Sequence, residues 1–480
     1  MPDDLTTLSA GEAVSAMRDG RMTALAYAEA LLARCAAGAD LNAFIALDPD
    51  AVRAAARAAD ARRAAGEPLG PLHGLPVPVK DSIATADLPT TAGTTALRDF
   101  RPAHDAGIVA RLRAAGASVL GKTNLHELSM GWSSNNQAFG AVRNPWDRTR
   151  IPGGSSGGTA AAVAAGMAPL GLAEDTQGSI RVPAALCGIA GFRPTTGRYP
   201  SDGCAPISPL FDQIGPHARC VADLALFDAV ITGEDAPLDP LLLDGLLLNG
   251  LRLNGLRLGI VRDYYFDGID PAVAAVVETA LGRLADAGVT LVETEFPGLG
   301  TLIAAITSAV QAHDVVPSLT AWLEAMGAPV GFDAMFAQVS PDVATLLRQI
   351  ALPGAPHATS EAAYAAARDV HRPALQAQFA QWFADNRVDA MILPATMTTA
   401  TPIGEDDHLH IAGRDVPFRF AMGRNIAPGS TAGLPGLVLP AGLANGLPVA
   451  IEIDGPAGSD RAVLAMGRAI EGVLGTLPLR

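Results

Sequence analysis

Residues 9–66 carry alanine and other apolar side chains at the spacing of amphipathic helices. Because that spacing of about 3.6 residues leaves one apolar face, the segment is predicted to form a helical layer packed outside a sheet. Polar residues that cap helices give the expected starts. The three helices are expected to open at Ser9 or Ala10, at Thr23 before Ala24–Cys35, and at Asp48, with the last ending near Gly66.

The pattern changes at Leu72. Short apolar runs at Leu75–Val79 and Ser118–Leu120 then alternate with amphipathic helices such as Gly107–Ala115. This alternation is typical of parallel strands joined by crossover helices. The sequence therefore predicts an α/β fold.

In the second half of the chain, a long and mainly helical stretch, residues 262–380, precedes a return of strand patterns. Strands are expected at Leu256–Val261, Asp389–Leu393, Gly436–Leu439 and Val449–Ile453, before a closing helix at Ser459–Leu474. No linker rich in Pro, Gly or Ser separates independent units, so a single domain over 1–480 is predicted. Its parts are a helical N-terminal layer (1–66), a catalytic core (67–230), a variable lid-like part (231–385) and C-terminal core strands with a helix (386–480).

Leu241–Ile260 holds a near-repeat of leucine-rich units that end in Asp-Gly or Asn-Gly. These dipeptides favour tight turns. The segment is too brief for a solenoid, whose repeats span about 20 residues or more. We expect an inserted connection that leads into the strand at Leu256.

Composition narrows the class of protein. The 480 residues are 49% hydrophobic and 17% charged, with a net charge of −15, which allows a large core and disfavours nucleic acid or an anionic membrane as partner. Met1–Glu12 shows no signal-peptide pattern, and Thr159–Ala173 is too short to span a bilayer. The cysteines show no CxxC spacing and are expected to be reduced, so a cytoplasmic enzyme is the expectation. They are Cys35, Cys187, Cys204 and Cys220.

Two glycine-rich turns carry the candidate chemistry. Gly153–Gly158 reads GGSSGG and contains Ser155, and Asp175–Arg181 reads DTQGSIR and contains Ser179. Glycine lets backbone N–H groups approach a bound atom closely, as an oxyanion hole beside a serine nucleophile requires. Lys80 ends an apolar, strand-like run upstream. Two serines and a lysine indicate acyl transfer without histidine.

These segments resemble the amidase signature family of serine hydrolases, and the resemblance extends over roughly Leu5 to Glu471. Further landmarks in the family's order are Gly121-Lys122-Thr123-Asn124, Asn144-Pro145-Trp146, Val388 to Pro394 and Gly433-Leu434-Pro435. The resemblance implies one large, twisted, mostly parallel mixed sheet with helices on both faces. It also implies hydrolysis of amide-type C–N bonds without a metal or cofactor.

The resemblance assigns roles to individual residues. Ser179 would be the nucleophile, Ser155, in a cis peptide, would relay its proton, and Lys80 would be the base. A neutral lysine is needed, and burial disfavours its charged form. The backbone N–H groups of Thr176, Gln177, Gly178 and Ser179 would form the oxyanion hole. Gln177 replaces a family glycine and would be strained by about 1–2 kcal/mol if its φ were positive.

Neighbouring residues have simpler interpretations. Asp175 is expected to orient the loop of Ser179, and Arg181 to support the same turn through a buried carboxylate or carbonyl. Taken alone, Lys80-Asp81 could be a surface ion pair, and serines in glycine turns could merely cap helices. His126-Glu127 is expected to be structural.

Three alternative functions compete with this interpretation. Gly153–Gly157 satisfies the G-x-S-x-G elbow of α/β-hydrolases, with Ser155 as nucleophile, but no buried strand precedes it. Gly116–Thr123 satisfies the phosphate-loop pattern of ATP-binding proteins, but it follows a helix. A non-catalytic binding protein is disfavoured because all three reactive residues are kept. The elbow would need one of His313, His357, His371 or His410.

The substrate is expected to be a small, neutral molecule. Ser129 matches a family substrate contact, and the surrounding positions are apolar. Phe418–Ala427 offers arginines but no carboxylate for an α-ammonium group. Aryl amides and anilides are expected, with esters and carbamates (urethanes) also accepted; a homodimer stays an open alternative. The apolar positions are Leu125, Leu128, Met130 and Trp132.

Overall fold

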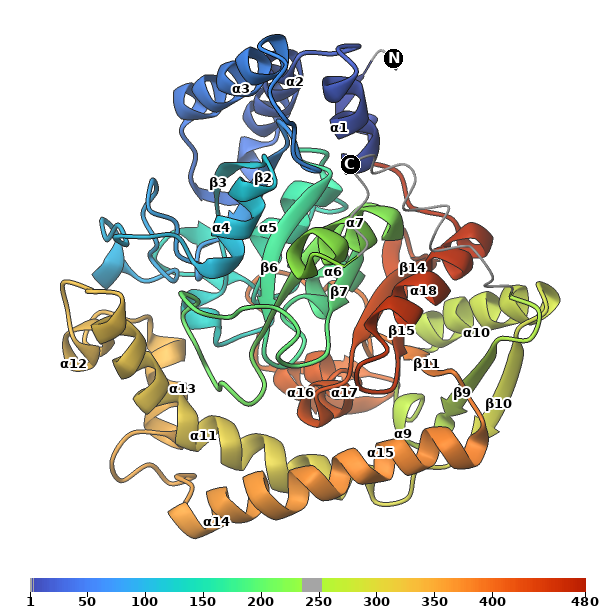
Figure 1. The fold of residues 1–480 in the computed structure, drawn as a ribbon. Coiled ribbons are helices and arrows are strands. Elements are labelled where there is room, and N and C mark those ends of the chain that lie inside the picture. Colours follow the sequence, from blue (N-terminus) through green and yellow to red (C-terminus); the bar gives the residue numbers. More distant parts are fainter. Residues whose placement is uncertain (1, 3, 235–252) are drawn as a thin grey trace.

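The computed structural model describes residue 2, residues 4–234 and residues 253–480. Its centre is an 11-stranded sheet surrounded by helices (Figure 1). In spatial order the strands are β1 (Phe44–Ala46), β3 (Ser118–Thr123), β2 (Pro76–Lys80), β6 (Leu170–Asp175), β8 (Gln213–Ala218), β7 (Ala190–Arg193), β14 (Gly436–Ala444), β15 (Leu447–Asp454), β11 (Ala390–Pro394), β9 (Arg257–Val261) and β10 (Thr290–Thr294). The α/β fold with a large mixed sheet is confirmed.

The sheet is more antiparallel than expected. Parallel pairing joins β3, β2 and β6 in one half and β11, β9 and β10 in the other. Between them, β8, β7, β14 and β15 pair antiparallel. The hairpin between β14 and β15 needs only a tight turn at Asn445-Gly446, where both residues have positive φ, as short hairpin loops do. Parallel pairing is therefore confined to two groups of strands, one on each side of the central antiparallel strands.

The N-terminal helices follow the predicted caps. α1 (Ala10–Arg18) starts with a capping box between Ser9 and Glu12, α2 (Ala24–Ala37) is capped by Thr23, and α3 (Pro49–Ala64) by Asp48. Each cap satisfies N–H groups that the first helical turn leaves without a partner. The three helices gather at one end of the molecule, beside β3 (Figure 1).

Helices cover both faces of the sheet centre, and every residue of β6 and β15 is therefore buried. The covering helices are α4 (Gly107–Ala114), α5 (Gly157–Ala164), α6 (Arg181–Cys187), α7 (Val221–Thr232), α10 (Pro271–Asp286) and α18 (Asp460–Leu474). The predicted strand at Leu256–Val261 is β9, whereas residues 241–252 of the near-repeat lie outside the described residues. β10, inside the stretch expected to be mainly helical, was not predicted.

An arm of helices follows β10 and runs along the side opposite the N-terminal layer (Figure 1). It comprises α11 (Leu299–Ala325), α12 (Phe332–Phe336), α13 (Pro341–Ile350), α14 (Glu361–Ala366) and α15 (Arg372–Asn386). Among the described helices, α11 alone is long and apolar enough to span a membrane; 39% of its most apolar window is buried, and core helices pass the same test. The remaining elements are α9 (Arg262–Tyr265), α16 (Phe418–Gly423), α17 (Ala427–Ala432), and the two-stranded pairs β4 (Asn135–Asn136) with β5 (Gly140–Ala141) and β12 (His408–Ile411) with β13 (Arg414–Pro417).

Candidate active site

The site forms where the neighbouring parallel strands β2 and β6 end. Lys80 is the last residue of β2, and Asp175 is the last residue of β6. Ser179 follows in the turn that leads from β6 into α6. Parallel strands end at the same edge of a sheet, where α/β proteins commonly place their reactive groups. This topology brings together segments that lie far apart in the sequence.

Lys80 and Ser155 are in direct contact. Lys80 Nζ donates a hydrogen bond of 2.6 Å to Ser155 Oγ, and both side chains are buried. Ser155 lies in the glycine turn before α5, and the Gly154–Ser155 peptide is cis, as the resemblance implied. Ser179 is joined to this turn through the backbone, since its carbonyl accepts the N–H of Ser156 at 3.3 Å. Among the described residues, no hydrogen bond links the hydroxyls of Ser155 and Ser179.

Glu174 is a contact that sequence reasoning missed. Its Oε1 lies 2.8 Å from Lys80 Nζ, and the two side chains are 4% and 0% exposed. The backbone carbonyl of Glu174 also accepts the hydroxyl of Ser156 at 3.0 Å. The one available signal was an acidic residue at the end of an otherwise apolar strand, next to the Ser179 turn.

Asp175 orders the Ser179 turn, as expected. Its carboxylate accepts the N–H of Gly178 at 2.7 Å and that of Ile180 at 3.1 Å, and it pairs with Arg181 at 3.0 Å. Burial opposes the charged form, but Arg181, Arg193 and the Gly178 N–H together outweigh burial and lower the pKa of Asp175 to about 2. Gly178 N–H, one of the four expected oxyanion donors, is thus already engaged by this carboxylate. Arg181 also reaches the buried Glu452 at 2.6 Å.

The strain considered for Gln177 does not arise. The positive φ of this turn, +109°, falls on Gly178, and Gln177 is outside the left-handed region. The side-chain amide of Gln177 donates to Thr431 Oγ1 at 3.3 Å, while its Oε1 is buried without a hydrogen-bond partner in the described structure. Its backbone carbonyl accepts the indole N–H of Trp132 at 3.0 Å.

A small inner cavity of about 50 Å³ adjoins the turn that contains Ser179. Ser179, Gln177 and Ser129 line it, together with the apolar Met130 and Trp132. The hydroxyl of Ser129 is buried and has no partner among the described residues. Of the four apolar positions expected at the pocket wall, Leu125 and Leu128 do not line this cavity and are buried elsewhere.

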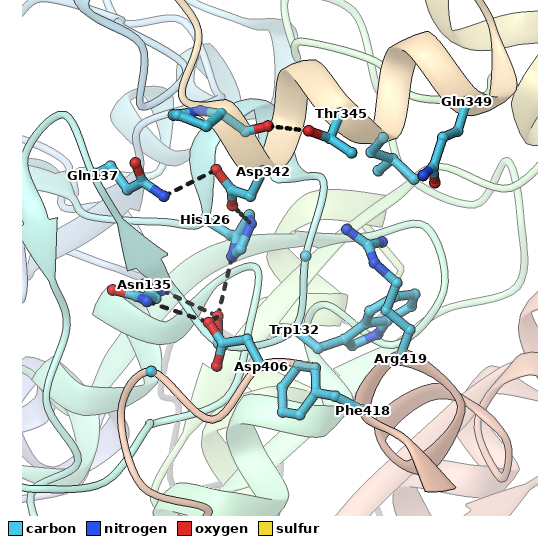
Figure 2. Close-up of a pocket in the computed structure, with 15 residues that line it drawn as sticks. His126, Trp132, Asn135, Gln137, Asp342, Thr345, Gln349, Asp406, Phe418 and Arg419 are labelled. Atoms are coloured by element: carbon cyan, nitrogen blue, oxygen red, sulfur yellow. Dashed lines mark hydrogen bonds and ion pairs between the residues drawn. The ribbon is translucent and has the colours of Figure 1, made fainter. Parts of the chain in front are cut away.

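A larger outer cavity of about 570 Å³ (Figure 2) shares lining residues with the inner one. Trp132 and Arg419 line both cavities and therefore stand between them. The Arg419 guanidinium carbon lies 5.6 Å from the centre of the Trp132 ring, and an Arg419 N–H donates to the Met130 carbonyl at 3.0 Å.

The outer cavity contains carboxylates that the sequence argument did not foresee. Asp342, from α13, lies 3.4 Å from the Nε2 of His126, and Asp406 accepts the hydroxyl of Ser133 at 3.0 Å. Burial opposes the charge of Asp342, but the contacts with His126 and Ser340 hold its pKa well below the usual range. The sequence argument considered residues 418–427, which contain no carboxylate; Asp342 and Asp406 come from other parts of the chain.

The competing motif interpretations do not fit the structure. Lys122 and Thr123 lie inside strand β3, whereas a phosphate loop would place them at the start of a helix. Lys122 Nζ instead donates to the carbonyl of Ile83 at 2.8 Å. Ser155 is not preceded by a strand of the main sheet, and its hydroxyl bonds Lys80. No hydrogen bond joins Ser155 to the histidines considered for an elbow, His313, His357, His371 and His410, in the described residues.

Comparisons with known proteins identify the family of the chain. A family profile described as Amidase matches residues 26–464. The chain is 41% identical to an indoleacetamide hydrolase of Agrobacterium vitis (96% of each chain) and 39% identical to a mandelamide hydrolase of Pseudomonas putida (99% of this chain, 93% of the relative). A crystal structure described as an amidase superposes with a TM-score of 0.85 at 33% identity, over 98% of this chain and all of the other. The chain belongs to the amidase family of amide-cleaving hydrolases.

Proposed function

We propose that the protein cleaves amide-type C–N bonds through an acyl-enzyme on Ser179. Ser155 takes the proton of Ser179 while passing its own to a neutral Lys80, and the Ser179 oxygen attacks the substrate carbonyl. The relay then runs backwards to protonate the leaving amine, and water releases the acid. A serine hydroxyl needs such a base because it is not acidic at neutral pH. The 2.6 Å contact between Lys80 and Ser155 carries this proposal.

The developing oxyanion would be stabilised by N–H groups of the Ser179 turn. Gly178 N–H is occupied by Asp175, so we assign the role to Thr176, Gln177 and Ser179. Fixed backbone donors of this kind cost no reorganisation during the reaction. Asp175 and Arg181 would contribute by keeping the turn rigid.

The substrate we propose is a neutral aryl or alkyl amide or anilide. Met130 and Trp132 give the inner cavity an apolar wall, which suits such groups. The names of the two relatives, indoleacetamide hydrolase and mandelamide hydrolase, also denote amides with an aromatic ring in the acyl part. Carbamates and esters fit the same chemistry, since their acyl-enzymes would meet the same oxyanion donors.

Two buried polar atoms in the inner cavity favour substrates that carry an N–H group. Gln177 Oε1 can only accept a hydrogen bond, and Ser129 Oγ can accept or donate; neither has a partner among the described residues. A buried polar atom without a partner costs about 1–3 kcal/mol. An amide or carbamate N–H would satisfy Gln177 Oε1, whereas an ester would not. We therefore propose a preference for amides over matched esters.

The outer cavity would receive the rest of the substrate. A cavity of about 150 Å³ accommodates benzene, and the inner cavity, at about 50 Å³, is smaller. An aryl substrate would therefore displace Arg419 from Trp132 and extend into the outer cavity. There Asp342 is paired with His126 and Asp406 Oδ2 accepts from Ser133, while Asp406 Oδ1 has no hydrogen-bond partner among the described residues, which favours a polar end that donates a hydrogen bond.

A hydrolysis panel tests this function. Nitroanilides, primary amides, aryl carbamates and matched esters would be compared, with the Ser179→Ala protein as blank. We expect turnover of anilides and amides that disappears in Ser179→Ala and is insensitive to chelators. A consistent preference for free glutamine over a nitroanilide would contradict the neutral substrate and leave the assignment of Ser179 intact.

A further inference from the structure

Glu174 is placed to control Lys80. In the described structure, the hydrogen-bond partners of the Lys80 ammonium are two side chains, Ser155 at 2.6 Å and Glu174 at 2.8 Å. The pair is shielded from water, with Lys80 0% and Glu174 4% exposed. Water and salt screen a buried pair little, so the attraction between the carboxylate and the amine is stronger than it would be at the surface.

We propose that Glu174 is a positioning residue that fixes the Lys80 amine against Ser155 in the geometry that the proton relay needs. The inference rests on the proposed function, in which a neutral Lys80 starts the relay. It adds a fourth side chain to Ser179, Ser155 and Lys80. Glu174 affects the reaction only by its contact with Lys80.

The backbone explains how Glu174 can hold this geometry. It lies in β6, opposite Ile214 of β8, in a strand buried on both faces. Its carbonyl accepts the Ser156 hydroxyl, and the Ser156 N–H in turn donates to the Ser179 carbonyl. One residue therefore contacts the base through its side chain and the serine turn through its backbone. Sites held by strands are more rigid than sites held by loops.

Three further titratable groups near the pair are shifted towards their uncharged forms, whereas Asp175, next to Glu174 in the chain, is held charged by Arg181 and Arg193. Burial and the charge of Glu174 raise the pKa of Asp212 to about 8. Burial raises the pKa of the Cys204 thiol well above its usual range, and burial lowers the pKa of His217 to about 4. Of the carboxylates near Lys80, Glu174 is the one in direct contact with its amine, because Asp175 is paired with Arg181 and Asp81 with Lys122.

The direction of the effect follows from charge. An adjacent carboxylate favours the ammonium form of a lysine and so delays the appearance of the neutral amine as pH rises. An opposite charge at this separation shifts a titration by about 1–3 pH units. Removing the charge of Glu174 should let the relay operate at lower pH.

The test is the pH dependence of serine labelling by a fluorophosphonate, which needs no knowledge of the substrate. In Glu174→Gln, which keeps an acceptor oxygen but not the charge, we expect the midpoint of the rising limb to fall by about 1–3 pH units. In Glu174→Asp, which keeps the charge on a shorter side chain, the midpoint should stay near that of the wild type while the plateau rate falls. Hydrolysis of a nitroanilide should show the same shifts.

Controls separate this role from a structural one. Asp81→Asn alters the neighbouring buried lysine pair and should lower the melting temperature without moving the midpoint. Asp212→Asn should leave the rising limb in place. An unchanged midpoint in Glu174→Gln, an equal shift in Glu174→Asp, or loss of the limb in Asp212→Asn would overturn the proposal. Labelling without amide hydrolysis would refute the proposed function but leave this test valid.

Discussion

Two buried lysines lie on neighbouring strands of the sheet and have very different surroundings. Lys80 ends β2, and Lys122 lies in β3, where it pairs in register with Val79. Both are fully buried, and each faces a carboxylate: Glu174 at 2.8 Å from Lys80, and Asp81 at 3.3 Å from Lys122.

The difference lies in the remaining partners. Lys122 donates to the carbonyls of Ile83 and Pro89 and to the hydroxyl of Thr90, at 2.8, 3.2 and 2.7 Å. Each lysine therefore contacts a hydroxyl, and the two hydroxyls differ in their location. Ser155, the partner of Lys80, lies in the turn beside Ser179, whereas Thr90, the partner of Lys122, contacts none of the proposed reactive groups in the described structure. Burial and a hydroxyl partner alone therefore do not make a lysine a base; the hydroxyl must also lie beside the nucleophile.

Removing Lys80 should have the largest effect on activity. General-base catalysis contributes about 10²–10⁴-fold, so Lys80→Met should lower kcat by that factor. The variant would also leave Glu174 buried without its cation, which destabilises a protein by about 3–5 kcal/mol. Lys80→Met/Glu174→Gln is therefore the better variant. Its melting temperature should exceed that of Lys80→Met, while its activity stays equally low; recovery of activity would contradict the role of Lys80.

The Lys122 pair should respond in the opposite way. Asp81→Asn breaks a buried ion pair, which is expected to cost about 3–5 kcal/mol of stability. The folded variant should keep most of its activity, because Asp81 contacts Thr91 and Lys122 and none of the proposed reactive groups. Unfolding in urea and nitroanilide turnover measure the two effects. A large loss of kcat with little loss of stability would contradict the assignment of a catalytic role to Lys80 and a structural role to the Lys122 pair.

The third prediction concerns Gln177, which lines the inner cavity beside Ser179. Gln177→Leu removes the acceptor Oε1 at similar volume. A neutral hydrogen bond contributes about 0.5–1.5 kcal/mol, so kcat/KM for an anilide should fall by about 2–10-fold relative to a matched ester. The ratio of the two kcat/KM values is the measurement, because general damage to the site would lower both. An unchanged ratio would remove Gln177 from substrate recognition.

The last expected effect is on stability at alkaline pH. The pKa of Asp212 is raised from its usual 3.8 to about 8 by burial and by Glu174. The folded protein therefore binds a proton that the unfolded chain releases. This contribution to stability is fully present below pH 3.8 and is lost as pH rises through 8. Melting temperatures between pH 6 and 9 should fall more steeply for the wild type than for Asp212→Asn; parallel curves would contradict the raised pKa.

Sequence patterns predicted the elements better than the contacts between them. Caps at Ser9, Thr23 and Asp48 and the strands that contain Lys80 and Lys122 depend on local patterns, and they were found close to their true positions. These features are set by neighbouring residues along the chain.

The missed features depend on tertiary structure. Glu174 meets Lys80 across 94 residues, which requires the pairing of β2 with β6. Taken alone, Lys80-Asp81 could be a surface ion pair. In the structure Lys80 pairs with Glu174 and Asp81 pairs with Lys122, and both pairs are buried. The two side chains separate because successive side chains near a strand end point to opposite faces. Asp342 reaches the outer cavity from an arm whose packing no local pattern predicts.

The central claim is that Ser179 is the nucleophile that Lys80 activates through Ser155. Incubation with a fluorophosphonate, digestion and peptide mass mapping tests it most directly. The account predicts a single adduct on Ser179 in the wild type and in Asp81→Asn, and little adduct in the Lys80→Met/Glu174→Gln protein. An adduct on Ser155, or undiminished labelling without Lys80, would contradict it.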